Sequence, residues 1–279
     1  MIIPSLNDLQ EIRKQGIYRT APVSMEILSD IKTPIEVLKI LKNVSDHCYL
    51  LESVADNEKW GRYTFLGYDP SLEITCLNGQ MKIGSLTFET TDPGSYIRQV
   101  VADHKSPRFD YLPSFTGGLV GYFSYDYLKY AEPTLRLDAE DTEGFKDVDL
   151  MLFDKVIAFD NFRQKIILMV NIDLEHLETE YNRASLELRS MADLIKNGEP
   201  REDIPGHCTT QVTPLFQKEE YCEMVENAKH HIKEGDIFQI VLSNRLEAGF
   251  EGSLLNTYRI LRTLNPSPYM FYFSSSDME

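Results

Sequence analysis

Apolar residues recur at helical spacing in one long segment of the chain. The residues that share this face are Leu177, Tyr181, Ala184, Leu188, Met191 and Ile195, which follow one another at intervals of four and three positions. Such spacing lines one face of an α-helix, and Asn197-Gly198 is a common way to end one. The pattern predicts an amphipathic helix that packs on a sheet.

The N-terminal part of the chain combines one helix with a series of short strands. Thr33-Pro34-Ile35-Glu36 is typical of a helix start, because Thr33 and Glu36 can form a capping box and Pro34 is tolerated in the first turn. We expect this helix to run to about Asn43. Strands are predicted over residues 49–52, 62–68, 72–77, 80–83 and 85–89. Asn78-Gly79 predicts a tight hairpin turn, because both residues tolerate positive φ.

Two stretches near the middle of the chain also predict strands. A hairpin is expected to join residues 150–159 to residues 164–172 across Asp160-Asn161. Residues 117–123 are rich in glycine and aromatic side chains. Their glycines lack the first spacer and the following helix of a dinucleotide-binding loop, so a closely packed strand is the favoured interpretation.

The stretch 198–214 has no hydrophobic period and is typical of a linker, with Gly198, Pro200, Pro205, Gly206 and Pro214. We therefore predict two domains, residues 1–205 and 206–279. Beyond the linker, the pattern predicts helices at about 221–232 and 254–264 and strands at 236–242 and 269–273. Roughly 65 residues after the linker are few for an independent domain, so we expect the second domain to be truncated.

The chain is acidic, with 28 Lys and Arg against 44 Asp and Glu and a formal net charge of −16. A broad surface for nucleic acid or an anionic membrane is therefore not expected. No stretch reaches the ~18 continuous apolar residues of a spanning helix, and the N-terminus does not resemble a signal peptide, so a cytoplasmic protein is expected. Cys48, Cys76, Cys208 and Cys222 form no Cys-x-x-Cys pair and are expected to be buried thiols.

Simple catalytic and metal motifs are absent from the sequence. It contains no Gly-x-Ser-x-Gly segment of the kind that carries a nucleophilic serine. The spacing of His207, Cys208, Cys222, His230 and His231 matches no common zinc site. No metal site is predicted within this chain.

Three short segments could carry a function. Leu50-Leu51-Glu52-Ser53 ends an apolar strand in a carboxylate and a hydroxyl, which can hold a ligand ammonium or simply cap a turn. Asn265-Pro266-Ser267-Pro268-Tyr269-Met270-Phe271 presents an aromatic and thioether surface, which ordinary core packing also explains. Gln239 interrupts an apolar strand pattern, and a bond to neighbouring backbone is its plain explanation.

Together these segments resemble the large subunit (component I) of anthranilate synthase, a chorismate-using family. The likeness runs from about residue 10 to the end in the order of the family. It rests on four motifs. These are Leu50-Leu51-Glu52-Ser53 with Trp60-Gly61-Arg62-Tyr63, Gly117-Gly118-Leu119-Val120-Gly121-Tyr122, Gly235-Asp236-Ile237-Phe238-Gln239-Ile240-Val241-Leu242-Ser243, and Asn265-Pro266-Ser267-Pro268-Tyr269-Met270-Phe271. The resemblance implies an α/β fold of the α+β type, in which two mostly antiparallel sheets pack together with helices outside.

The resemblance also implies an activity. Family members convert chorismate and ammonia to anthranilate and pyruvate, the first committed step of tryptophan biosynthesis. Ammonia would come from a glutamine amidotransferase subunit (component II), so a hetero-oligomer is implied, and Mg²⁺ would be the cofactor. The metal ligands and catalytic residues lie in the C-terminal half of the family, so this chain by itself is expected to be inactive.

A feedback site for L-tryptophan is implied as well. Its residues here would be Leu51, Glu52, Ser53, Pro268, Tyr269, Met270 and Phe271, with Glu52 on the ligand ammonium and Met270 and Phe271 beside the indole. Gln239 stands where relatives that add water to chorismate, or attack it covalently, carry a Lys. A neutral amide is neither a base nor a nucleophile, which favours an enzyme that uses ammonia. Two alternatives stay open: aminodeoxychorismate synthase component I, and a non-catalytic module that binds tryptophan and a partner.

Overall fold

The computed structural model describes residues 1–53, 61–132, 134–135, 141 and 143–279. By their contacts these residues divide into two compact units, Met1–Glu202 together with Leu261–Glu279, and Asp203–Ile260. The C-terminal segment therefore packs with the N-terminal residues. The predicted domains, 1–205 and 206–279, stay a prediction, because contact density alone does not define the domains of a family.

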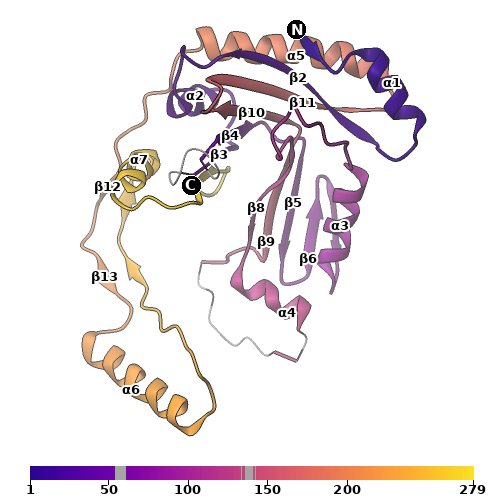
Figure 1. Cartoon of the computed structure of the whole chain (residues 1–279). Coiled ribbons are helices and arrows are strands. Elements are labelled where there is room, and N and C mark those ends of the chain that lie inside the picture. Colours follow the sequence, from indigo (N-terminus) through magenta and orange to yellow (C-terminus); the bar gives the residue numbers. More distant parts are fainter. Residues whose placement is uncertain (54–60, 133, 136–140, 142) are drawn as a thin grey trace. The chain divides into compact units, whose positions relative to one another are not determined.

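A seven-stranded antiparallel sheet forms the larger layer of the first unit (Figure 1). Its strands, in sheet order, are β1 (Ile2–Ile3), β2 (Thr20–Leu28), β11 (Lys165–Asp173), β10 (Lys155–Asp160), β4 (Tyr63–Tyr68), β3 (Cys48–Glu52) and β16 (Met270–Ser274). Every neighbouring pair in this order is antiparallel. The strand nearest the C-terminus therefore lies at one edge of a sheet built mainly by the N-terminal residues.

A five-stranded antiparallel sheet forms the second layer of the same unit. Its strands, in sheet order, are β7 (Leu86–Glu89), β6 (Gln80–Ile83), β5 (Leu72–Leu77), β9 (Val148–Phe153) and β8 (Gly118–Phe123). The strand predicted over residues 117–123 is thus present as β8. Its neighbour β9 leads directly into β10, so the chain passes from one sheet to the other within a few residues.

The helices of the first unit cover the outside of the sheets. They are α1 (Leu6–Lys14), α2 (Pro34–Leu41), α3 (Pro93–Asp103), the short η1 (Tyr125–Tyr127), α4 (Leu128–Ala131) and α5 (Leu177–Asn197). Helix α5 runs along β2 and β11, and α2 packs on β3 and β4 (Figure 1). This arrangement of two antiparallel sheets with outer helices confirms the predicted α+β fold class.

Local sequence signals account for several of these elements. Thr33 caps α2 and forms the predicted capping box with Glu36. Asn78 and Gly79 have φ values of 49° and 82° between β5 and β6, so the predicted hairpin turn forms with positive φ at both positions. The predicted apolar face of α5 is confirmed by the burial of Leu177, Ala184 and Leu188 with other residues of the same stripe.

One predicted strand is wrong in its length. Residues 150–159 were expected to form a single strand, but the chain bends at Asp154, and β9 and β10 belong to different sheets. The carbonyl of Asp154 accepts the backbone N–H of Asn171 at 2.8 Å, which holds the bend against β11. Both flanking strands are buried almost throughout, so the apolar run shows no alternation that would reveal the break.

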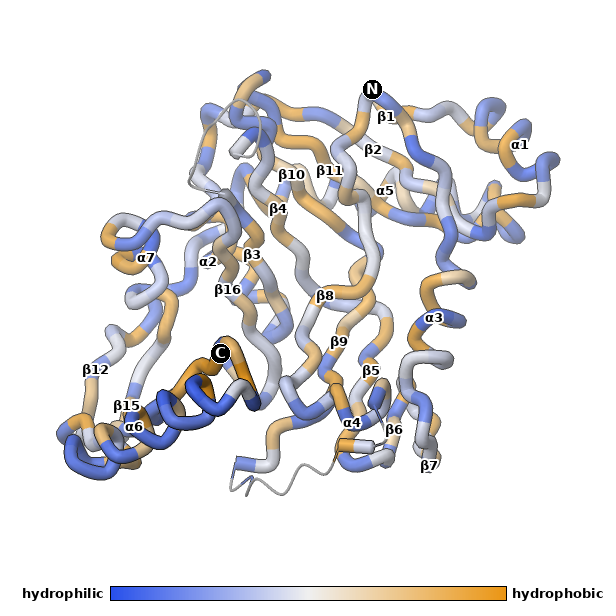
Figure 2. Tube along the Cα trace, turned by 60° about the horizontal axis from the view of Figure 1, so that its bottom comes forward, coloured by the Kyte–Doolittle hydropathy of each residue, from blue (hydrophilic) through white to orange (hydrophobic). Residues whose placement is uncertain are grey.

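Aromatic side chains fill the space between the two sheets. Tyr49 of β3, Met151 and Phe153 of β9 form a buried cluster, against which Phe65 of β4 and Phe273 of β16 pack. Figure 2 shows the neighbouring strands β10 and β11 as predominantly hydrophobic. The C-terminal strand is therefore held by side-chain packing between the sheets as well as by its backbone pairing.

The second unit is a pair of short two-stranded ribbons with one helix. Strand β12 (His207–Cys208) pairs with β15 (Phe250–Glu251), and β13 (Thr213–Pro214) pairs with β14 (Leu246–Glu247). Helix α6 (Lys218–Glu234) lies between β13 and β14 in the chain, where a helix was predicted at about 221–232, and it ends at Gly235, whose φ is +85°. Helix α7 (Leu255–Leu264) begins in this unit and ends in the first, and its prediction is confirmed.

Among the described residues, none of the helices is both long and apolar enough to cross a membrane. The expectation that all four cysteines are buried is wrong for two of them, because Cys48 and Cys76 are buried whereas Cys208 and Cys222 are exposed. The exposed pair lies on the second unit, where two short ribbons, α6 and the start of α7 provide little interior to bury a side chain.

Candidate functional site

The two segments of the predicted tryptophan site lie side by side as neighbouring strands. β16 pairs with β3 in an antiparallel register that sets Met270 opposite Glu52 and Phe271 opposite Leu51. These residues are more than two hundred positions apart in the chain. The tertiary structure thus brings together the Leu-Leu-Glu-Ser and Pro-Tyr-Met-Phe segments, which are far apart in the sequence.

Strand pleating divides these four side chains between the two faces of the pair. Glu52 and Met270 share one face and are buried, with 7% and 8% of their surface exposed. Leu51 and Phe271 share the opposite face, where Leu51 packs against the cluster between the sheets and Phe271 is largely exposed. A single ligand that contacts both Glu52 and Phe271 must therefore lie at the end of this pair or around its edge, where β16 is the last strand.

The other predicted residues lie at the ends of the two strands. Ser53 follows the last residue of β3 and is half-buried, while Pro268 and Tyr269 precede β16 and are exposed. The backbone N–H of Tyr269 is 3.3 Å from the hydroxyl of Ser267, which helps to shape the turn into the strand. Trp60, which belongs to the same sequence motif, lies outside the described residues.

The carboxylate of Glu52, which was predicted to bind a ligand ammonium, forms an ion pair with an arginine of this chain. Nη2 of Arg262, from the last turn of α7, is 2.7 Å from Oε2 of Glu52. The side chain of Glu52 is only 3% exposed, and that of Arg262 is 31% exposed. A buried carboxylate is costly unless it is paired with a cation or accepts hydrogen bonds, and Arg262 provides such a cation. Sequence reasoning missed this residue, although a basic side chain in the last turn of a predicted helix is a known stabilising position.

Gln239 is not on a strand. Residues 236–242 were predicted to be one, but they are irregular and follow α6 as an exposed segment, in which Phe238 is 93% and Val241 is 79% exposed. The strand prediction is wrong because alternation alone does not make a strand: backbone groups need a partner, and no strand among the described residues pairs with this segment. The role of Gln239 in selecting the nucleophile stays a prediction.

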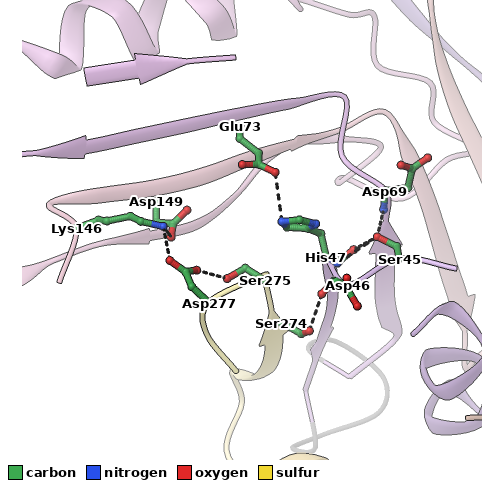
Figure 3. Close-up of polar contacts among 10 residues, drawn as sticks. All are labelled: Ser45, Asp46, His47, Asp69, Glu73, Lys146, Asp149, Ser274, Ser275 and Asp277. Carbon is green, nitrogen blue, oxygen red and sulfur yellow. Dashed lines mark hydrogen bonds and ion pairs between the residues drawn. The ribbon is translucent and has the colours of Figure 1, made fainter. Parts of the chain in front are cut away.

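Polar contacts hold the last residue of β16 and the segment that follows it (Figure 3). The hydroxyl of Ser274 donates to the carbonyl of Asp46 at 2.7 Å, and Nζ of Lys146 contacts Asp149 at 2.9 Å and Asp277 at 2.8 Å. Nearby, Nε2 of His47 is 3.2 Å from Oε1 of Glu73. The contacts of Ser274 and Asp277 hold the end of β16 that is remote from Glu52.

The two carboxyls on Lys146 have opposite pKa shifts. Burial raises the pKa of Asp149, even though the hydrogen bond from Lys146 acts in the other direction. The hydrogen bond from Lys146 lowers the pKa of Asp277, which is more exposed and also accepts from Ser275. Because one lysine serves both carboxylates, Lys146 connects the segment after β16 to the start of β9.

A second lysine contacts Tyr272 of β16 and Glu279 in the segment after it. Nζ of Lys42, which is buried just after α2, lies 2.8 Å from the hydroxyl of Tyr272 and 2.9 Å from Oε1 of Glu279. The Tyr272 hydroxyl also contacts Glu279. Neither Lys42 nor Lys146 was singled out from the sequence, because Tyr272, Glu279 and Asp277 lie more than a hundred positions away from the lysines that they contact.

Three cavities lie in other parts of the first unit. The first, of about 560 Å³, is lined by residues that include Arg13, His104 and Arg183. The others, of about 780 and 860 Å³, share Asn78 and Lys129. None of these three includes a residue of the predicted tryptophan site, so they do not bear on that prediction.

No metal centre is evident in the described part of the chain, which holds no group of three or more His, Cys, Asp or Glu side chains that could bind an ion. The Mg²⁺ that the family resemblance implies stays a prediction, with its ligands expected in the C-terminal half of the family.

Comparison with known proteins places the chain in a family. The sequence model of the chorismate binding enzyme family matches residues 46–279. Anthranilate synthase component 1 of Acinetobacter calcoaceticus is 37% identical to this chain, and the match covers 96% of this chain and 55% of the relative. Anthranilate synthase component 1 of Acetivibrio thermocellus is 35% identical, and the match covers 98% of this chain and 57% of the relative.

The solved structures agree with the sequence match. The crystal structure of anthranilate synthase component I from Streptococcus pneumoniae has a TM-score of 0.57 and 27% identity, and the match covers 86% of this chain and 52% of that chain. The chain thus spans about half the length of the relatives that it matches. With a family match over most of its length and the same fold in a solved relative, this chain belongs to the chorismate binding enzyme family.

Proposed function

We propose that the chain belongs to the large subunit of an anthranilate synthase, which converts chorismate and ammonia to anthranilate and pyruvate for tryptophan biosynthesis. The observation that carries this proposal is the name shared by the relatives at 31–37% identity, all of them anthranilate synthase component 1, one of them as a probable assignment. Ammonia would be delivered by a glutamine amidotransferase subunit in a cytoplasmic hetero-oligomer. Gln239 is consistent with this chemistry, because its amide cannot itself attack chorismate.

The proposal includes feedback inhibition by L-tryptophan at the end of the β3–β16 pair. Support comes from the register that sets Met270 opposite Glu52, because it places a thioether and a carboxylate together at a strand end. The carboxylate of Glu52 would accept the ligand ammonium, the hydroxyl of Ser53 would hydrogen-bond it, and Met270 and Phe271 would contact the indole. The ligand would join two strands from distant parts of the chain.

A route from this site to catalysis follows from the position of β16. A ligand that binds one arrangement of β3 and β16 more tightly than another shifts the protein toward that arrangement. β16 is joined directly to α7 by residues 265–269, and the chain after it is fastened by Lys146 and Lys42. Binding at Glu52 would therefore bias the elements on either side of β16.

The activity is tested by adding chorismate, ammonium and Mg²⁺ to the protein expressed from its natural gene together with its amidotransferase subunit. Anthranilate is fluorescent, so its appearance is followed directly and the product is identified by chromatography. Formation of anthranilate that L-tryptophan suppresses is the expected result. Formation of 4-amino-4-deoxychorismate instead would favour aminodeoxychorismate synthase, and saturable tryptophan binding without any turnover would favour the non-catalytic module.

A further inference from the structure

The chain contains two Asn-Gly pairs, Asn78-Gly79 and Asn197-Gly198. Asparagine before glycine is the dipeptide that loses ammonia most readily, because glycine has no side chain to hinder attack by its own backbone nitrogen. The two pairs share this intrinsic reactivity but differ in their surroundings. A comparison of the two therefore separates the effect of the fold from the effect of the dipeptide.

The reaction takes place within the pair. The backbone nitrogen of the glycine gives up its proton and forms a bond with Cγ of the asparagine, while the bond from Cγ to Nδ2 breaks and Nδ2 leaves as ammonia. Water then opens the resulting succinimide ring at one of its carbonyls and leaves an aspartate or an isoaspartate. Ring closure requires that the asparagine side chain and the glycine nitrogen turn toward one another.

Hydrogen bonds hold both reacting groups of Asn78-Gly79 in the turn between β5 and β6. Nζ of Lys129 donates to Oδ1 of Asn78 at 2.9 Å, and the backbone N–H of Gly79 donates to the hydroxyl of Tyr130 at 2.7 Å. The backbone N–H of Asn78 donates to Oδ2 of Asp147, also at 2.7 Å. The side chain and the nitrogen that must meet in the reaction are thus each bound to another residue.

These restraints converge on one buried carboxylate. Asp147 is 2% exposed, and it accepts from Nζ of Lys129 and from the hydroxyl of Tyr130, each at 2.8 Å. Burial raises the pKa of Tyr130, so the phenol keeps its proton and donates it to Asp147. A buried carboxylate that loses such donors is strongly destabilised. The turn is therefore anchored to the interior of the smaller sheet.

Asn197-Gly198 is held by weaker means at the protein surface. Asn197 is the last residue of α5, and its Nδ2 donates to the exposed Asp193 at 2.7 Å. The N–H of Gly198 donates to the carbonyl of Leu194 at 2.8 Å. Both bonds belong to the last turn of a helix, and helix ends fray readily. This pair should therefore open more often than the pair in the hairpin.

We propose that Asn78-Gly79 is a modification site that loses ammonia when the turn opens, and that Lys129, Tyr130 and Asp147 slow this reaction in the folded protein. Refolding does not reverse the modification. An isoaspartate lengthens the main chain of a two-residue turn, and an aspartate at this position shares Lys129 with Asp147. The extent of modification thus records how often this end of the smaller sheet has opened.

Mass spectrometry of peptides, with chromatographic separation of the isoaspartyl form, follows both pairs in one sample. The protein is incubated at mildly alkaline pH in native buffer and in concentrated guanidinium chloride. In denaturant we expect the two pairs to react at similar rates. In native buffer Asn78 should react at least about tenfold more slowly than in denaturant, the effect of one to two ordinary hydrogen bonds, and more slowly than Asn197. Equal rates for Asn78 in the two solvents, or a faster rate in native buffer, would overturn the inference without any mutation.

Two variants show which side chains are responsible. Tyr130→Phe removes the acceptor of the glycine N–H and keeps the ring, and Lys129→Met removes the cation and keeps the length of the side chain. Each should speed the reaction of Asn78 in native buffer about twofold to tenfold, the range for one hydrogen bond, and leave Asn197 unchanged.

Lys82→Met is the matched control, because Lys82 is exposed on β6 of the same hairpin. Circular dichroism shows whether each variant is folded. If both test variants fold and Asn78 reacts at the wild-type rate in each, the role of Lys129 and Tyr130 is wrong. If a variant unfolds, the wild-type comparison between native buffer and denaturant decides the matter by itself.

Discussion

The ring of Tyr49 on β3 meets the ring of Phe153 on β9 edge to face, with centroids 4.7 Å apart and an angle of 77° between the ring planes. Both residues are fully buried, and they come from different sheets. Their contact therefore joins the sheet that carries the candidate site to the smaller sheet. Edge-to-face pairs of this kind add about 0.5 to 1.5 kcal/mol to the effect of buried area.

The hydroxyl of Tyr49 should lower the stability of the fold. It is buried and has no hydrogen-bond partner among the residues that the structure describes, and burial raises the pKa of the phenol. We expect Tyr49→Phe to increase the free energy of unfolding by about 1 to 3 kcal/mol, the cost of an unsatisfied buried polar group. Urea denaturation followed by circular dichroism measures it. A clear loss of stability would mean that the hydroxyl has a partner.

Gly67 on β4 should tolerate no side chain while Tyr49 stays in place. A Cβ atom at Gly67 would lie 2.1 Å from Cε1 of Tyr49, so the ring would have to move. We expect Gly67→Ala to lower the free energy of unfolding by about 1 to 3 kcal/mol, as overpacking of a core usually does. The double variant with Tyr49→Leu should recover part of this loss. Equal stability of Gly67→Ala and the wild type would show that the ring relaxes without cost.

The pair Arg62–Asp160 should stabilise the protein most at neutral pH. Burial raises the pKa of Asp160, but hydrogen bonds from Arg62 and from two backbone N–H groups outweigh it and hold the pKa below its ordinary value. A lowered pKa contributes stability above the unfolded pKa of about 3.9 and loses it as the pH falls through the folded value.

Arg62→Met tests this pH dependence. We expect it to cost about 1.5 to 3 kcal/mol at pH 7, the usual value of a hydrogen bond to a charged group. The difference between variant and wild type should shrink at acidic pH, as Asp160 becomes protonated in both proteins. Unfolding by urea at several pH values gives the comparison, and a difference that stays constant down to pH 2 would contradict it.

The four thiols should react in two classes. Burial raises the pKa of Cys48 to about 12, and Cys76 is equally covered, whereas Cys208 and Cys222 are exposed. With a thiol reagent at pH 8, we expect Cys208 and Cys222 to react quickly and the other two only after unfolding, because the thiolate is the reactive species. Mass spectrometry of the labelled peptides identifies them. Rapid labelling of Cys48 in the folded protein would contradict its burial.

Two substitutions should relieve inhibition by tryptophan. Ser53→Phe would fill the end of the β3–β16 pair, and Met270→Thr would remove the thioether beside Glu52. Each should raise the tryptophan concentration for half inhibition about tenfold to a hundredfold, which corresponds to a lost contact of ~1.5 to 3 kcal/mol. Met25→Thr on β2, four strands removed from β3 in the sheet, is the control. Unchanged values in both variants would mean that the site is placed wrongly.

Local chemistry made much of the fold predictable. Thr33 and Glu36 specify a helix start within four residues, Asn78-Gly79 specifies a turn within two, and the stripe from Leu177 to Ile195 specifies a helix face. Each signal depends only on neighbours in the chain. The predictions failed where the structure depends on distant residues. The bend at Asp154 depends on which sheet each half of an apolar run joins, and no strand in the described part of the chain pairs with residues 236–242.

For the candidate site, the sequence by itself supplied the residue types and the family likeness: a carboxylate and a hydroxyl after an apolar strand, and a Pro-Tyr-Met-Phe segment far along the chain. Only the tertiary structure decided that Glu52 lies opposite Met270, that Leu51 and Phe271 point to the other face, and that Arg262 holds the carboxylate. The physical reason is that register and ion pairing are set by long-range contacts. Residues two hundred positions apart acquire them only when the sheet has formed, so no pattern within either segment can encode them.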